Sequence, residues 1–120
     1  MPFQYLLTNL IVDVPGAHGA IFLDPEGEFV DYVTRRASPY ELKLEGAYHG
    51  LLLRLAARLL RGARGGEVVQ VTVAGSQLKV LSRQLKGGYY LVLLMDPEAP
   101  LAWADRAVDL AAQVLNQEIP

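Results

Sequence analysis

Two short segments of this chain are almost continuously apolar, GAIFL at residues 19–23 and YYLVLLM at residues 89–95. A run of this length suits a β-strand, and a strand without polar alternation has both faces of its sheet covered, normally by helices. The sequence therefore predicts a sheet with these two segments in its middle and helices on both sides. At 120 residues the chain has the size of one domain, and we expect residues 1–120 to form a single domain.

Periodicity and turn residues predict the other elements. A first helix ends before Pro15. A long helix begins at Ser38, because a capping serine is followed by Pro39 at the first helical position and by Glu41 three residues after the cap, and it runs to about Arg61. The predicted strands cover residues 17–24, 28–36, 67–74, 77–85 and 89–96. A last helix follows, so the order is helix, strand, strand, helix, three strands, helix.

Two of the other predicted strands differ in how they would behave at a sheet edge. The strand at 28–36 carries Asp31, Arg35 and Arg36, and such charges discourage pairing with another chain. The strand at 67–74, EVVQVTVA, alternates like an edge strand but has no proline and no charge after Glu67. An unprotected edge can recruit a second chain, so we expect this strand to pair across a dimer. The interface residues predicted from it are Val69, Gln70, Val71, Thr72 and Val73.

The long helix carries two apolar stripes at helical spacing. The wider one is predicted to dock on the sheet and consists of Leu44, Tyr48, Leu51, Leu52, Leu55 and Leu59. The other is predicted to be an outer seam for a second helix and consists of Gly46, Gly50, Leu53, Ala57 and Leu60. Each interior glycine costs up to about 1 kcal/mol relative to alanine, and close approach of a partner helix would account for it. The alternative is that the leucines are ordinary exposed residues and the glycines are tolerated.

The order of elements and two segments together resemble the Roadblock/dynein light-chain family, including its bacterial MglB branch. The segments are the hairpin GAHGAIFLDPEGEFV at residues 16–30, whose acidic turn ends in Gly27, and the tail YYLVLLMDPEAPL at residues 89–101. In the tail, Asp96 is followed by Ala-Pro-Leu at 99–101. The resemblance spans nearly the whole chain.

The resemblance implies an α/β fold with one antiparallel five-stranded sheet in the order 2-1-5-4-3. The long helix would lie on one face and the two terminal helices on the other. It also implies a homodimer in which third strands join into one sheet and long helices lie side by side. Many members of the family serve small Ras-like GTPases as scaffolds or regulators.

A search for an active site in the sequence finds no catalytic set. His18 and His49 lie in different elements with no cysteine or carboxylate at ligand spacing, so we expect a strand-end and a helix-surface residue. No serine lies in a nucleophile motif, and the GARGG loop at 62–66 follows a helix, whereas a phosphate loop precedes one. We therefore expect no catalytic residue, no cofactor and no metal, and at most regulation of a partner's active site.

Three arginines, Arg54, Arg58 and Arg61, recur along one flank of the long helix. They are either a solvated border whose stems cover apolar surface or a ridge that recognises an acidic patch on a partner. The net charge of −2 gives no general attraction to nucleic acid or anionic lipid.

The chain has no cysteine, and its apolar stretches fall short of the ~18 residues needed to cross a bilayer, so we expect a soluble cytoplasmic protein. The function that fits best is that of a non-catalytic homodimer that binds a small Ras-like GTPase, either as a scaffold or as a regulator of its activity. Two alternatives remain open: an adaptor that organises a complex without affecting nucleotide hydrolysis, and a small-ligand sensor.

Overall fold

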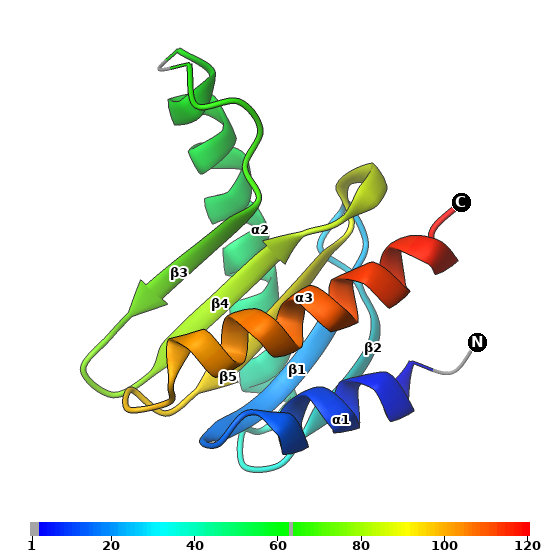
Figure 1. The fold of residues 1–120 in the computed structure, drawn as a ribbon, viewed down its shortest axis with the longest axis vertical. Coiled ribbons are helices and arrows are strands. Elements are labelled where there is room, and N and C mark those ends of the chain that lie inside the picture. Colours follow the sequence, from blue (N-terminus) through cyan, green and yellow to red (C-terminus); the bar gives the residue numbers. More distant parts are fainter. Residues whose placement is uncertain (1–2, 63) are drawn as a thin grey trace.

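Five antiparallel strands form one sheet with helices on both faces (Figure 1). The computed structural model describes residues 3–62 and 64–120. The helices are α1 (Gln4–Asp13), α2 (Pro39–Arg61) and α3 (Leu101–Glu118), and the strands are β1 (Ala17–Leu23), β2 (Phe29–Thr34), β3 (Gln70–Ala74), β4 (Lys79–Gln84) and β5 (Tyr90–Met95). The strand order is β2-β1-β5-β4-β3, with α2 on one face and α1 and α3 on the other. The predicted fold class, order of elements and strand order are confirmed.

The two apolar segments are the central strands β1 and β5, as predicted. They pair with each other, for example Ile21 with Val92 and Phe22 with Leu91. Alternate residues of each strand enter two separate cores: Phe22 and Leu91 pack with α1 and α3, whereas Ile21 and Val92 pack on the side of α2. The apolar side chains of β1 and β5 are therefore buried on both faces of the sheet, as strands of this composition require.

The local signals at the element ends act as the sequence predicts. The side chain of Ser38 accepts a hydrogen bond from the backbone N–H of Glu41 at 3.0 Å and caps α2. The hairpin between β1 and β2 turns at Gly27, whose φ of +86° suits glycine and whose N–H donates to the carbonyl of Asp24 at 3.0 Å. Helix α1 ends at Asp13, ahead of Pro15.

The two stripes of α2 are exchanged relative to the prediction. Gly46, Gly50 and Leu53 are buried against the sheet, so the prediction that they form an outer seam is wrong. A Cβ on Gly46 would lie 3.0 Å from Leu23, and a Cβ on Gly50 would lie 2.4 Å from the hydroxyl oxygen of Tyr90. The glycines do permit a close approach, but the approach is between α2 and its own sheet.

The stripe predicted to dock on the sheet faces outward instead. Its exposed members are Leu44, Tyr48, Leu51, Leu55 and Leu59. Leu52 is half-buried, as are Ala57 and Leu60, which pack against the α2-side core. Helical periodicity identified both apolar stripes correctly but not which of them packs on the sheet.

Strand β3 is shorter than predicted. Pairing with β4 begins at Gln70 rather than at Glu67, and Val69 is 63% exposed. Val68 is buried in the α2-side core, to which Leu53 also belongs, and anchors the connection that leads into the strand. The prediction that this strand lies at the edge of the sheet is confirmed by the strand order.

Replacing Gly50 by alanine should lower the free energy of unfolding by about 1–3 kcal/mol, because the added methyl group collides with the buried Tyr90 hydroxyl. Denaturant unfolding measures the change. Gly62→Ala is the matched control, since a Cβ there meets nothing within 4 Å and stability should stay the same or rise. A Gly50→Ala protein more stable than the unmutated chain would show that the helix does not approach the sheet as described.

A candidate protein-interaction surface

The outer edge of β3 has backbone groups without a strand partner among residues 3–62 and 64–120. The N–H of Gln84 donates to the carbonyl of Val69 at 2.9 Å, which fixes the phase of the antiparallel ladder between β3 and β4. Since amide groups of successive residues alternate in direction, the backbone N–H and C=O of Gln70 and Thr72 point away from β4. These groups form a free edge that could accept another strand.

The side chains of β3 are divided between the two faces of the sheet. Val71 is half-buried against the α2-side core, and Val73 is 43% exposed. Gln70 faces α3: its amide nitrogen donates to Asp105 at 2.8 Å, and its amide oxygen accepts two hydrogen bonds from Arg83 at 2.6 and 3.0 Å. The backbone of Gln70 is thus available at the edge, whereas its side chain is held within the monomer.

Helix α2 presents different flanks toward the two ends of the sheet. The ammonium group of Lys43 lies 4.2 Å from the ring centre of Phe29 on β2, whereas the ring of His49 lies against Ser82 on β4. Helical spacing places Leu52 and Leu59 near the flank that carries His49. An apolar edge of the exposed stripe therefore runs along the side of α2 that faces β4 and β3.

Arg54, Arg58 and Arg61 are all exposed and lie on the opposite flank, at helical spacing from Lys43. They line an open groove of about 380 Å³ together with Leu51, Leu55 and Ala57. Within residues 3–62 and 64–120, none of the three forms an ion pair with an acidic side chain. The groove combines positive charge with apolar floor and suits an acidic, partly apolar surface.

His49 is buried, with 4% of its surface exposed, so the prediction of a helix-surface residue is wrong. Its Nδ1 lies 3.3 Å from the hydroxyl of Ser82, and that hydroxyl lies 3.2 Å from the carbonyl of Val71, to which it can donate. This chain of contacts ties α2 to the middle of β3 through β4. The sequence held a signal for it, since His49 shares a helical face with Leu42 and Leu53. Burial lowers the pKa of His49 below its ordinary value of 6.5.

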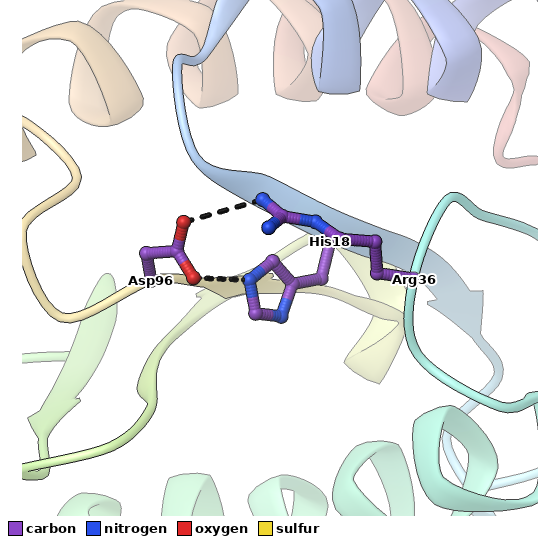
Figure 2. Close-up of polar contacts among 3 residues, drawn as sticks. All are labelled: His18, Arg36 and Asp96. Carbon is purple, nitrogen blue, oxygen red and sulfur yellow. Dashed lines mark hydrogen bonds and ion pairs between the residues drawn. The ribbon is translucent and has the colours of Figure 1, made fainter.

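A second polar cluster lies where three segments meet (Figure 2). His18 Nε2 is 2.5 Å from one carboxylate oxygen of Asp96, and Arg36 Nη2 is 3.2 Å from the other. The hydrogen bond from His18 is the main cause that lowers the pKa of Asp96, and the charges of His18 and Arg36 add to it. Because both carboxylate oxygens of Asp96 have partners within the chain, we interpret the cluster as a tie between β1, the segment after β2 and the segment after β5.

Stability should fall as the pH is lowered from 7 through 6.5, because unfolded His49 takes up a proton at its ordinary pKa before the buried ring does. The stability stops falling once the pH is below the pKa of His49 in the folded protein. Denaturant unfolding at several pH values measures the slope, and His49→Leu should flatten it while other groups titrate as before. Equal slopes for the two proteins between pH 7 and pH 5 would contradict a neutral buried imidazole.

Comparison with solved structures identifies the architecture. A Roadblock/LC7 domain from Streptomyces avermitilis superposes with a TM-score of 0.89 at 20% identity over 98% of both chains. MglB from Myxococcus xanthus gives a TM-score of 0.83 at 12% identity over 96% of this chain and 85% of that one. A structure described as MglB with tetrameric arrangement gives 0.85 at 16% identity over 94% and 84%.

Comparisons based on sequence find no counterpart: no family model matches, and no curated protein matches. At identities below 25% the structural likeness carries the fold alone. The agreement nevertheless extends over nearly the full length of the chain and confirms the architecture expected from the resemblance. The chain therefore has the Roadblock/LC7 fold, with MglB proteins among its structural neighbours.

Proposed function

We propose that this protein is a cytoplasmic homodimer that binds a small Ras-like GTPase and has no catalysis of its own. The observation that carries the proposal is the free edge of β3 beside an exposed apolar stripe on α2, in a chain with MglB-like structural neighbours. No helix within residues 3–62 and 64–120 is long and apolar enough to span a membrane.

The dimer contact starts from the backbone of β3. Unpaired N–H and C=O groups at a sheet edge gain hydrogen bonds when a second strand is added, and two antiparallel copies of one strand can pair about a twofold axis. The edges at Gln70 and Thr72 would join two sheets into one. Such a contact needs no change of structure in either copy.

The helix part of the dimer contact differs from the one predicted by sequence. The sheet covers Gly46, Gly50 and Leu53, so these three residues are not part of the proposed dimer interface. In their place we propose the outward stripe on the side of β3, chiefly Leu52 and Leu59. Leu59 is 68% exposed in the monomer, so covering it against a second helix removes apolar surface from water.

The arginine groove would remain open in this dimer, because it lies on the flank of α2 opposite the one that carries His49, Leu52 and Leu59. We propose that Arg54, Arg58 and Arg61 contact an acidic patch on the GTPase. The family resemblance supports the class of partner, and the charge and shape of the groove support the position. A regulator would change the rate of GTP hydrolysis by the partner, whereas an adaptor would bind the partner without changing that rate.

Thr72→Pro should convert the dimer into a monomer, because proline removes an outward N–H without removing a bond to β4. The mass in solution, measured by sedimentation, should fall by half. Thr72→Val is the control, since it keeps the N–H and should keep the mass. A Thr72→Pro protein that is folded by circular dichroism and unchanged in mass would contradict strand pairing at this edge.

Reversing two charges, Arg54→Glu with Arg58→Glu, should reduce GTPase capture at least tenfold while leaving the mass of the dimer unchanged. Capture is measured by pull-down with a Ras-like GTPase that is encoded near this protein and loaded with a GTP analogue. Arg35→Glu reverses an exposed charge outside the groove and should have no effect. Undiminished capture by the double variant would reject the groove as the contact.

A GTP-hydrolysis assay with the same GTPase separates regulation from adaptor function. Faster hydrolysis in the presence of the unmutated protein, lost in the Arg54/Arg58 double variant, is the result expected of a regulator. Capture with unchanged hydrolysis would favour the adaptor.

A further inference from the structure

We propose that a polar network between α3 and β3 positions the outer edge of β3 for self-association, with Arg83 as its central residue. The network consists of Gln70 on β3, Arg83 on β4, and Asp105 and Asp109 on α3. The inference rests on the proposed β3 dimer and deepens it. Arg83, Asp105 and Asp109 do not belong to the edge strand that a second copy would meet, so they are positioning residues rather than contact residues.

Side chains hold β3 to the sheet at Gln70, where the backbone points away from β4. Gln70 lies opposite Arg83 in the ladder. The backbone bonds of an antiparallel pair skip every second residue, and here the N–H of Gln84 donates to the carbonyl of Val69 at 2.9 Å. The direction of the outward N–H and C=O of Gln70 therefore depends on what its side chain contacts.

The side-chain amide of Gln70 fits the network in one orientation. Its nitrogen donates to the carboxylate of Asp105 at 2.8 Å, and its oxygen accepts from Nε and Nη2 of Arg83 at 3.0 and 2.6 Å. Half a turn of the amide would set its oxygen against the carboxylate and its NH₂ group against a guanidinium, which has no acceptor. This pattern of donors and acceptors fixes the Gln70 side chain and limits the movement of the backbone that carries it.

Arg83 is held in turn by α3. Its Nη1 lies 2.6 Å from a carboxylate oxygen of Asp109, and its side chain is 13% exposed. A guanidinium carries its N–H donors in a rigid planar fork, so one group can bond Gln70 through two nitrogens and Asp109 through the third. Helix α3 itself is packed into the core on this face of the sheet (Figure 1). The start of the edge strand is thus tied to a helix that the core holds in place.

An edge that is already ordered binds a second strand more tightly than a mobile edge. Only monomers whose edge has the pairing conformation can associate, and the apparent dissociation constant rises as their fraction falls. Ordering a flexible segment at the moment of contact also costs free energy. The network orders Gln70 when the monomer folds, so this cost does not fall on association.

Arg83→Met tests the central residue, because it removes the bonds to Gln70 and Asp109 but keeps a long unbranched side chain. We expect the dissociation constant of the dimer, measured by sedimentation, to rise about tenfold. Arg83→Lys keeps the positive charge and should restore part of the affinity. Arg106→Met is the control, since Arg106 is exposed on α3 and outside the network, and it should leave the dissociation constant unchanged.

A double-mutant cycle tests whether Asp109 acts through Arg83. Asp109→Ala alone should weaken the dimer, although Asp109 lies on a different element from the edge. Combined with Arg83→Met it should weaken the dimer no further than Arg83→Met does alone, because the two residues belong to one network. Additive effects of the two substitutions would reject the network as a unit.

The mobility of the Gln70 backbone separates positioning from a purely structural role. It is measured by ¹⁵N relaxation in the Thr72→Pro background, with and without Arg83→Met. Arg83→Met should lower the order parameter of the Gln70 amide toward the value of about 0.6 that marks flexible backbone. The amide of Ala74 is the internal control, because β3 ends there in a turn closed by the N–H of Gly75 and the carbonyl of Leu78 at 2.8 Å. A residue that only stabilised the fold would lower the free energy of unfolding and leave the dissociation constant and the Gln70 order parameter unchanged.

The unmutated protein distinguishes failure of this inference from failure of the dimer. A dimer whose dissociation constant is the same with Arg83→Met overturns the positioning role and leaves the β3 dimer standing. A weaker dimer with an unchanged order parameter at Gln70 rejects positioning through that residue. An unmutated protein that is monomeric at every concentration rejects the dimer, and this role of the network with it.

Discussion

Helix α2 lies so close to the sheet that the hydroxyl of Tyr90 donates a hydrogen bond to the backbone carbonyl of Gly46 at 3.0 Å. A side chain at Gly46 or Gly50 would stand between the helix and strands β1 and β5, so glycine at both positions permits the contact. The approach fixes the rotation of α2 about its own axis. It therefore decides which apolar stripe is covered by the sheet and which faces solvent, and the interaction surfaces proposed for this helix follow from that choice.

The same rotation places the other functional features of α2. His49 turns toward Ser82 on β4, and the carbonyl of Val71 on the edge strand completes that connection. The arginine flank turns the other way, beyond the part of the helix that a partner copy would cover. Burial of glycine, histidine and leucine on one side thus leaves two exposed surfaces with different chemistry: an apolar one on the flank that carries His49 and a basic one on the opposite flank.

The sequence predicted the architecture well because its signals are local or compositional. The apolar strands β1 and β5, the cap at Ser38 and the acidic turn at Gly27 each depend on residues that are neighbours in the sequence. The rotation of α2 was predicted wrongly because both stripes are apolar, and the decisive contacts come from Leu23 and Tyr90, distant in the chain. The same holds for His18 and Asp96, which meet across 78 positions, and for His49, whose partner Ser82 depends on the placement of α2 over β4.

Hydrogen exchange at the amide of Thr72 tests the central claim, that a second copy covers the outer edge of β3, most directly. Inside one chain this amide points away from β4, and the part of the chain that the structure describes places no strand beyond it. Slow exchange in concentrated protein, with acceleration on dilution to the monomer, is the predicted result. Exchange as fast as in an unstructured peptide at every concentration would contradict the account.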